Sequence, residues 1–301
     1  MSASPHFVIV NGAAGGGRAR QRISEALREL HNAGLETEVH RTAHPAHATE
    51  LAREAADAGH RKFITMGGDG TSFEVINGLF AAAPPETPFQ LGLIPLGTGN
   101  SFLRDFEVTD TDEAIRRIVR GKSGPCDVLR VSHRDGILHY MNILSIGFSA
   151  SAGELTNRRF KPFGAAGYIL AVVSSLASLQ HPQDPIRVDG TELVDDRAAT
   201  LLSFSNSKFT GGAMMMAPSA DTADGKLDVI RVGKLSRIEL LRAFPRIFQG
   251  THTTMPIVEE QQVKRVDFLE EREQPVMIDG EIMHLALRSI EVMPGALELY
   301  R

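Results

Sequence analysis

The stretch Phe63-Ile64-Thr65-Met66-Gly67-Gly68-Asp69-Gly70-Thr71 joins two apolar segments that differ in their periodicity. Residues 63–66 form a short β-type run, whereas the apolar residues of 75–80 recur at helical spacing. The glycines between them allow a tight turn, and the amides at the start of a helix attract an anion. The stretch therefore predicts a strand, a phosphate-binding turn and a helix. A glycine turn in which Asp69 only caps the helix is the alternative.

The same alternation of strand and helix runs through the first third of the chain. Short β-type runs are expected at residues 6–11, 35–40, 63–66 and 91–94, and a helical pattern follows each of them. Asp110 and Glu113 resemble a capping box at the start of the last of these helices. Alternation of this kind predicts an α/β fold with a mostly parallel sheet that helices cover on both faces.

Glycine-rich loops follow three of the expected strands, at residues 11–18, 67–71 and 95–100. The carboxyl ends of parallel strands share one edge of a sheet, so these loops are expected to converge where backbone donors can surround a triphosphate. A carboxylate in such a loop is favourable beside a cation, and Asp69 therefore suggests Mg²⁺ next to the phosphates. None of the loops matches the P-loop pattern, and the first lacks the dinucleotide-binding pattern.

The pattern changes near Gly124 and Pro125. Beyond this point most apolar runs are short and β-like, beginning with a hairpin that turns at residues 133–136. Helical patterns interrupt them at residues 163–179 and 236–248. We expect a nucleotide-binding α/β domain over residues 1–128 and a mainly antiparallel β-sandwich domain over residues 129–301, with the last ~12 residues packing back on the first domain.

The composition excludes several classes of protein. The 301 residues carry 32 basic and 37 acidic side chains, a net charge of −5, and no long basic cluster marks a nucleic-acid partner. The single cysteine, Cys126, excludes an intramolecular disulfide and is expected to be buried. The N-terminus lacks a signal-peptide pattern, and the longest apolar segment is shorter than the ~20 residues of a membrane-spanning helix. We expect a cytoplasmic protein without a transmembrane segment.

Two of the glycine loops together resemble a known family. Gly67-Gly68-Asp69-Gly70-Thr71 followed by Gly97-Thr98-Gly99-Asn100 is similar to the catalytic domain of diacylglycerol kinases and sphingosine kinases, above all the bacterial soluble lipid kinases. Further segments fall in the family's order, so the resemblance covers nearly the whole chain: residues 142–148, 206–212, 217–228 and 279–281. The first motif alone is shared with NAD kinases and, loosely, with phosphofructokinases.

By this resemblance the glycine loops bind ATP, and the N-terminal domain is of the NAD kinase and diacylglycerol kinase type. The implied ATP-binding residues are Asn11, Thr42, Gly67, Gly68, Asp69, Gly70, Thr71, Ser72, Phe73, Gly97, Thr98, Gly99 and Asn100. Without the resemblance, Thr42 would be an ordinary residue at the end of a strand.

The resemblance also implies a structural Mg²⁺ ion held by Asp221, Asp224 and the backbone carbonyl of Lys226. Two carboxylates three residues apart, followed by glycine, suit a hard cation that prefers oxygen ligands. An aspartate-rich turn that leads into a strand at residues 227–232 is the alternative, and the residues alone favour it.

Glu281 is implied to be the general base. It would accept the proton of a lipid hydroxyl as that oxygen attacks the γ-phosphorus of ATP, and Asp69 is expected to take part in catalysis with Mg²⁺. Asp279 and Glu281 flank Gly280, so a turn there would aim one or both carboxylates at the cleft between the domains. A hairpin turn with two solvated acids is the alternative.

A lipid substrate needs an apolar receptacle, which we expect at residues 163–179. This segment is apolar around much of a helical circumference, although packing in the core would produce the same pattern. Arg158, Arg159 and Lys161 precede it and are expected to meet anionic headgroups at a membrane surface. A solvated basic turn explains them equally well.

Two departures from the family pattern bear on activity. Gly12 replaces the proline that usually follows the asparagine, and Ser101 replaces an aspartate that many bacterial members carry, with Asp105 expected to compensate in part. We expect an ATP- and Mg²⁺-dependent kinase of a diacylglycerol-like or sphingoid lipid that acts peripherally on membranes, and we leave a homodimer open. The alternatives are a kinase of a soluble hydroxyl compound such as NAD, and a nucleotide- or lipid-sensing module without catalysis.

Overall fold

The apolar runs near the N-terminus form a parallel β-sheet in the computed structural model, which describes residues 5–13, 19–81, 87–96, 100–148, 150, 174, 176 and 179–301. The strands are β1 (His6–Val10), β2 (Thr37–Arg41), β3 (Lys62–Gly67) and β4 (Phe89–Pro95), and the end of β17 (Glu281–Tyr300) joins them. Their order is β2, β1, β3, β4, β17, and each neighbouring pair is parallel. β1, β3 and β4 are buried on both faces, which is why they form nearly continuous apolar runs in the sequence, whereas the edge strand β2 is partly exposed.

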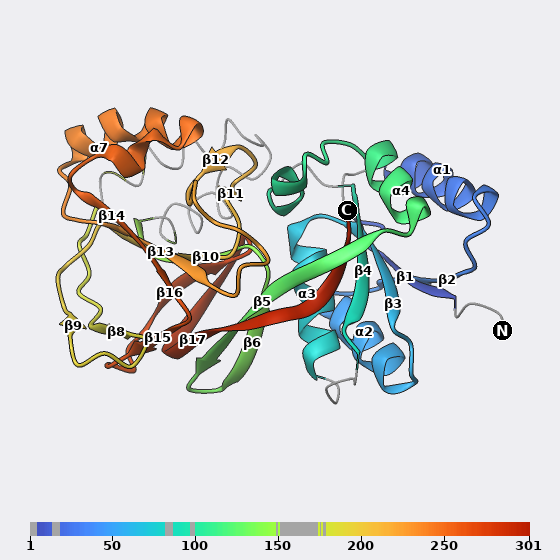
Figure 1. Ribbon diagram of the computed structural model, residues 1–301, viewed down its shortest axis with the longest axis horizontal. Coiled ribbons are helices and arrows are strands. Elements are labelled where there is room, and N and C mark those ends of the chain that lie inside the picture. Colours follow the sequence, from blue (N-terminus) through green and yellow to red (C-terminus); the bar gives the residue numbers. More distant parts are fainter. Residues whose placement is uncertain are drawn as a thin grey trace. The chain divides into compact units, whose positions relative to one another are not determined.

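Helices cover both faces of this sheet (Figure 1). The contacting pairs are α1 (Ala19–Asn32) with α4 (Thr111–Arg120), and α2 (His47–Asp57) with α3 (Asp69–Ala81). At the start of α4 the Asp110 carboxylate accepts a hydrogen bond from the Glu113 N–H at 2.8 Å. Only half of the expected capping box forms, because the Glu113 side chain pairs instead with Arg117 at 2.7 Å.

The chain folds into two units, Met1–Val128 with Gly295–Arg301 and Leu129–Pro294. β5 (Ser123–His133) leads from the first unit into the second, and β17 leads back. Within the first unit, Asp127 accepts a hydrogen bond from the Gly295 N–H at 2.7 Å. The neighbouring Cys126 is completely buried, and burial raises the pKa of its thiol to about 12. The thiol is therefore unreactive.

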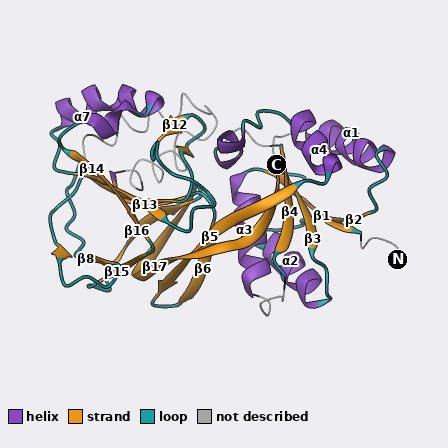
Figure 2. Ribbon diagram, viewed as in Figure 1, coloured by secondary structure: helices purple, strands orange, loops and turns teal. Residues whose placement is uncertain are grey.

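The second unit contains two antiparallel sheets (Figure 2). One has the order β14 (Val258–Val263), β13 (Leu227–Val232), β10 (Leu201–Ser205), β7 (Ile143–Gly147), β16 (Glu273–Ile278) and the start of β17. The other includes β6 (Gly136–Tyr140), β15 (Arg265–Phe268), β8 (Ile186–Val188) and β9 (Val194–Asp195). Phe204 and Phe268 meet edge to face at 5.5 Å across the interior, and Phe204 is completely buried. The expected sandwich is confirmed.

Helical segments follow β13 and cover its apolar end. They are α7 (Arg237–Ala243) and the 3₁₀ helices η6 (Phe244–Gln249) and η7 (Thr251–Thr254). A short hairpin of β11 (Phe209–Thr210) and β12 (Met214–Met215) precedes β13. α7 begins with a complete capping box between Ser236 and Glu239. Among the described residues, no helix is long and apolar enough to span a bilayer.

Candidate functional site

The turn between β3 and α3 is fixed by the close packing of Gly67 against Thr71. A side-chain carbon on Gly67 would lie 2.3 Å from Thr71 Oγ1 and 2.5 Å from its Cβ, so a larger residue would displace Thr71. The amides of Thr71 and Ser72 donate to the carbonyl of Gly68 at 2.9 and 3.2 Å. The start of α3 therefore lies directly at the carboxyl end of β3, the position in which a helix N-terminus can bind phosphate.

Asp69 connects this turn to the loop that follows β4. Its Oδ2 accepts a hydrogen bond from the Ser101 N–H at 3.1 Å, and Ser101 is buried immediately before the 3₁₀ helix η2 (Phe102–Phe106). The carboxylate thus holds two strand-end loops together rather than only capping its own helix. Ser101 supplies its backbone amide, which any residue at this position offers. Asp105, the expected substitute for the lost acid, is half-buried on η2.

Asn11 joins the loop after β1 to the same turn. Its Nδ2 donates to Thr71 Oγ1 at 3.0 Å, and its Oδ1 accepts from the Ala13 N–H at 3.0 Å. Thr42 directly follows β2, and its N–H donates to the carbonyl of Val10 at 3.0 Å. The ends of four neighbouring strands therefore bring most of the expected ATP-binding residues to one edge of the sheet.

Part of that expected set cannot be placed. Gly97, Thr98 and Gly99 lie outside the described residues, and Asn100 is half-buried at their border. Ser72 and Phe73 lie within α3, where Phe73 is buried. Gly12 is exposed, and no described residue lies within 4 Å of the side-chain carbon that another residue would add. The loop geometry therefore does not require glycine at position 12.

Glu74, which no sequence pattern indicated, orders the segment after Thr42. From α3, its carboxylate oxygens accept the N–H groups of Ala46 and Ala48, each at 3.1 Å. These amides belong to the start of α2, where a negative charge is favourable. No local signal identifies Glu74, because its partners precede it by 26 and 28 residues.

His44, His47 and Glu50 gather at the same helix start, with potential ligand atoms within 4.8 Å of one another. The two imidazole rings stack at 4.5 Å with planes only 17° apart, and His47 Nδ1 accepts the Ala43 N–H at 2.9 Å. A metal ion binds an imidazole nitrogen in the plane of its ring, and nearly parallel planes offer no common point. We therefore interpret this cluster as a stabilising contact at the start of α2 and not as a metal site.

Asp221, Asp224 and Lys226 lie in a turn that leads into β13. Asp221 Oδ1 accepts the Ala223 N–H at 3.0 Å, and Asp224 Oδ1 accepts the Lys226 N–H at 2.9 Å. Both carboxylates are exposed, and Gly225 has a φ of 72° that bends the chain between them and the strand. The turn is ordered by its own hydrogen bonds, and each of these bonds uses one carboxylate oxygen.

A third acid, Asp228, lies beside this turn in the first part of β13. It is buried, and its Oδ1 has no hydrogen-bond partner among the described residues. Gln262 of β14 hydrogen-bonds both Asp228 and Asp224, the latter at 3.4 Å. Burial raises the pKa of Asp228 to about 7, and the charges of Glu260 and Asp224 add to this rise. Such a gathering of oxygen donors fits a hard cation such as Mg²⁺.

Asp279 and Glu281 lie in the hairpin turn between β16 and β17, and they differ completely in environment. The φ angles of Asp279 and Gly280 are 47° and 88°, as in the tight turns that favour glycine. Asp279 is buried, and its carboxylate accepts the N–H groups of Met141, Asn142 and Ile143 at 3.2, 3.2 and 2.9 Å. Burial raises its pKa to about 6, although these amides oppose the rise.

Glu281, the first residue of β17, is exposed. The alternative of two solvated acids is therefore wrong for Asp279. The turn presents one carboxylate to solvent and uses the other as an anchor. Nearby, Asn206 donates from Nδ2 to the carbonyl of Met141 at 2.7 Å, and Ser207 Oγ donates to Asn142 Oδ1. These buried contacts bring three separate motif segments together at one turn.

An apolar cavity of about 80 Å³ lies beneath α7 and η6. Leu240, Ala243, Phe244 and Ile247 line it at helical spacing, and Met214, Met216, Val232 and Val258 are among the residues opposite. His252 also lines the cavity. Its Nε2 donates to the Met216 carbonyl at 3.0 Å, which requires the tautomer with the proton on Nε2. Its Nδ1 has no hydrogen-bond partner among the described residues. Burial lowers the pKa of His252, which favours the neutral form of the imidazole.

The receptacle expected at residues 163–179 lies mostly outside the described residues, as do Arg158, Arg159 and Lys161. Of that segment, Leu176 is described and buried. The sequence did predict a helix over residues 236–248, yet we assigned it no role. The spacing of Leu240, Phe244 and Ile247 was the available signal for an apolar face.

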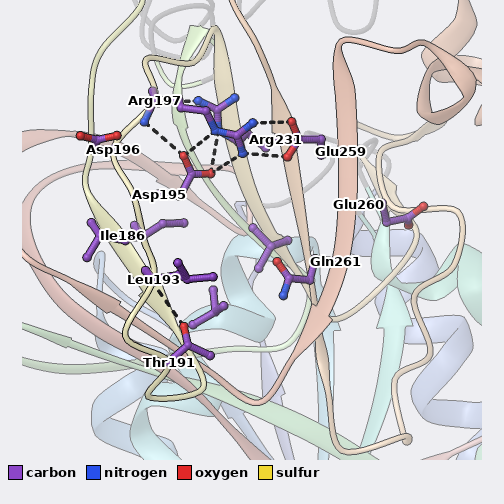
Figure 3. Close-up of a pocket in the computed structure, with 13 residues that line it drawn as sticks. Ile186, Thr191, Leu193, Asp195, Asp196, Arg197, Arg231, Glu259, Glu260 and Gln261 are labelled. Carbon is purple, nitrogen blue, oxygen red and sulfur yellow. Dashed lines mark hydrogen bonds and ion pairs between the residues drawn. The ribbon is translucent and has the colours of Figure 1, made fainter.

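A larger hollow of about 840 Å³ opens between β8, β9, β13 and β14 (Figure 3). Both of its arginines pair with carboxylates: Arg197 contacts Asp195 at 2.8 Å and Glu259 at 2.7 Å, and Arg231 contacts Asp195 at 3.0 Å. Ile186, Leu193 and other apolar residues form the rest of the wall. Because its arginines are engaged by carboxylates, this hollow is a poor site for phosphate.

Comparison with protein families gives matches to both halves of the chain. Residues 5–131 match the diacylglycerol kinase catalytic domain, and residues 142–301 match the YegS C-terminal NAD kinase beta sandwich-like domain.

Individual proteins give the same result. The chain is 31% identical to a diacylglycerol kinase of Mycobacterium tuberculosis, over 97% of this chain and 94% of that protein. It is 30% identical to a probable YegS-like lipid kinase of Chromohalobacter salexigens, over 91% and 87%. Its fold is similar to the crystal structure of a putative diacylglycerol kinase from Bacillus anthracis, with a TM-score of 0.80, 25% identity and coverage of 99% and 97%.

Proposed function

The chain belongs to the family of diacylglycerol kinases and YegS-like lipid kinases, and from this premise we propose that it transfers the γ-phosphate of ATP to the hydroxyl group of diacylglycerol or a sphingoid base. As a lipid kinase it is a phosphotransferase with an alcohol as acceptor. We further propose that it acts from the cytoplasm at the membrane surface, where such lipids reside.

In this proposal ATP binds at the carboxyl edge of the parallel sheet. The turn of Gly67, Gly68 and Gly70 receives the phosphates at the start of α3, while Asn11 and Thr71 hold the neighbouring loops in register. Thr42 and Asn100, with Gly97, Thr98 and Gly99, complete the nucleotide site by their place in the family motifs. Asp69 fixes the loop after β4 through its hydrogen bond to Ser101. Beside the phosphates, its carboxylate would favour the Mg²⁺ ion that balances their negative charge.

Mg²⁺ fits the acids at the start of β13. Asp221, Asp224 and the carbonyl of Lys226 would hold a structural ion, and the buried, unsatisfied Asp228 beside them supports a cation here. Mg²⁺ supplies positive charge that offsets these carboxylates and, when bound with ATP, the charge of the phosphates.

The observation that carries the proposal is the anchored turn of Asp279 and Glu281. Three amides clamp the Asp279 carboxylate, so the backbone at Glu281 is fixed while its side chain stays in solvent. A carboxylate placed in this way is suited to accept the proton of a substrate hydroxyl. The apolar cavity beneath α7 supports a lipid substrate. Its volume of about 80 Å³ is well below the ~300 Å³ of a typical ligand pocket, so α7 and η6 would have to move outward to admit a chain.

A transfer assay tests this proposal. The purified protein is incubated with γ-labelled ATP and MgCl₂ and offered diacylglycerol, sphingosine or NAD, the lipids in mixed micelles. We expect label in a lipid product. Label in the phosphorylated dinucleotide but in no lipid would overturn the proposal, and ATP binding without any transfer would favour a sensor.

A further inference from the structure

The segment formed by α7 and η6 exposes large apolar side chains to solvent. Ile238, Leu241 and Phe248 are 61%, 45% and 42% exposed, and neither helix contains a fully buried residue. Exposed apolar groups gathered on one short segment mark an interaction surface more often than scattered ones do. α7 lies on the outside of the second unit (Figure 1).

The exposed side chains lie on the opposite face of the segment from the cavity. Leu240, Ala243, Phe244 and Ile247 point inward, where they line the apolar cavity. The outer residues alternate with them along the sequence, and the ring of Phe248 packs edge-on against Phe244 at 5.6 Å. The segment is therefore apolar on two sides, one of which packs on the protein and one of which is exposed, with no described residue covering it.

Basic residues surround the outer apolar face. Residues 234–249 contain four basic side chains and one acidic side chain, in a protein whose net charge is −5. The single acid, Glu239, is engaged in the capping box at the start of α7. Arg242 and Arg246 are exposed beside Leu241 and Phe248. The outer face therefore combines apolar groups with a local excess of positive charge.

We propose that this outer face docks the protein on a bilayer that contains anionic phospholipid. The docking face consists of Ile238, Leu241 and Phe248, which enter the headgroup region, and of Arg242 and Arg246, which contact the anionic headgroups. An amphipathic segment with aromatic and aliphatic residues framed by arginines has the chemistry of interfacial binding. The cavity on the inner face of the same helices would then open next to the lipid that it receives.

Charge decides between a bilayer and a second copy of this chain. A symmetric contact between two copies places the same patch on both sides of the interface, so the arginines of one copy would face those of the other. An anionic lipid surface neutralises them instead. The proposal rests on the proposed lipid kinase function for the identity of the lipid substrate, but docking is measurable without turnover.

Vesicle flotation without ATP is the test. Wild-type protein is mixed with vesicles of phosphatidylcholine alone or with phosphatidylglycerol added, next to two variants: the triple Ile238→Ser/Leu241→Ser/Phe248→Ser and the double Arg242→Gln/Arg246→Gln. Matched controls are Leu193→Ser, which is 83% exposed elsewhere on the second unit, and the double Arg28→Gln/Arg53→Gln on exposed positions of α1 and α2. Circular dichroism melts establish that all variants are folded.

We expect wild-type protein to float with the anionic vesicles, and both variants to lose about tenfold or more in partitioning while the controls do not. The proposal would be overturned if wild-type protein did not float with anionic vesicles, or if the two variants floated with them as wild type does. A dimer of wild type that the triple variant converts to monomer would overturn it too, because the face would then be a contact between copies.

A kinase assay separates this inference from the proposed function. With a short-chain, water-soluble diacylglycerol, the triple variant is expected to retain wild-type turnover, whereas with vesicle-embedded lipid its turnover falls with its binding. Specific vesicle binding without phosphorylation of any lipid would sustain the docking face and remove the proposed function. If the triple variant phosphorylates vesicle-embedded lipid as fast as wild type does, the proposed function would stand and the docking face would be excluded.

Discussion

The β3–α3 turn of the first unit and the β16–β17 turn of the second each combine glycine with an acidic side chain, yet different contacts hold them. Gly67 is fixed by Thr71, four residues further along the chain. Asp279 is fixed by amides that lie 136 to 138 residues earlier. The first turn is thus a local structure, and the second is a junction of distant segments.

This difference suits the two turns to the different roles that we propose for them. The local turn presents backbone amides, which suits a ligand that is recognised mainly by its phosphates. In the β16–β17 turn, one carboxylate, Asp279, is buried and anchored, and this holds the backbone of the exposed Glu281 in a defined place at the surface. A reacting side chain benefits from such support, because its position depends on residues that are themselves held by packing.

The largest effect is expected at the end of the supported turn. Glu281→Gln removes the proposed base but keeps the shape of the side chain, so turnover should fall about 100-fold to 10,000-fold while ATP affinity stays within about twofold. Steady-state kinetics and ATP titration measure the two quantities. Glu273→Gln, an exposed glutamate at the start of β16, is the control. Equal losses of turnover and ATP affinity would contradict the role given to Glu281.

The second-largest effect is expected at Asp279, the buried carboxylate that anchors the turn, and it concerns the free energy of unfolding. Asp279→Asn replaces one accepting oxygen by an NH₂ group that faces a backbone N–H, and it should lower the free energy of unfolding by ~3 kcal/mol. Asp135→Asn, at the exposed turn of the β5–β6 hairpin, should change it by less than ~0.5 kcal/mol. Urea unfolding gives both values. Equal small effects would mean that the clamp does not hold the turn.

The stability difference between wild type and Asp279→Asn should also depend on pH, in a direction that follows from the raised pKa of Asp279. The pKa of Asp279 is raised from 3.8 to about 6, so the folded protein binds more protons than the unfolded chain between these values. The stability contributed by the neutral carboxyl is therefore present below pH 3.8 and is lost as pH rises through about 6. Measured against Asp279→Asn, the stability advantage of wild type should shrink over this window. If the stability advantage of wild type stayed constant or grew as pH rose, the pKa of Asp279 would not be raised in the folded protein.

The contrast between the two turns also shows what the sequence could predict. Short-range patterns were sufficient for the first unit, where the apolar strands β1, β3 and β4 and the glycine turns are each readable within ten residues. The order of motifs was sufficient for the family and for the two kinds of fold. In both cases the determining contacts are local, or a relative already displays them.

Contacts between distant segments could not be predicted in this way. β17 continues through Pro294 and Gly295 to Tyr300, although both residues ordinarily interrupt a strand. The burial of Asp279 was not predicted, because its partners lie in another part of the sequence. Glu74 and the cavity under Phe244 were missed for the same reason, since burial of a side chain depends on what packs against it.

A smaller effect tests the local turn. Gly67→Ala places a methyl group against Thr71 and should cost ~2 kcal/mol of stability through strain, with a parallel loss of ATP affinity. Gly12→Ala is the matched control and should cost less than ~0.5 kcal/mol, because no residue that the structure describes lies within 4 Å of the added methyl group. Denaturant unfolding and nucleotide titration measure the pair. If both alanines were tolerated equally, the close contact at Gly67 would not be what shapes the turn.

The smallest effect concerns the acids at the start of β13, which share features of both turns. Asp224 makes a local hydrogen bond to Lys226, yet it also contacts Gln262 on the neighbouring strand. If Mg²⁺ binds there, an ion at ten times its Kd should stabilise the wild-type protein by about 1.4 kcal/mol, because binding to the folded state alone shifts the unfolding equilibrium. Asp224→Ala should abolish this gain in a thermal melt, whereas Asp196→Ala, an exposed acid of the same unit, should retain it. An identical Mg²⁺ response in both variants would show that the cation binds elsewhere and that the turn is held by its own hydrogen bonds.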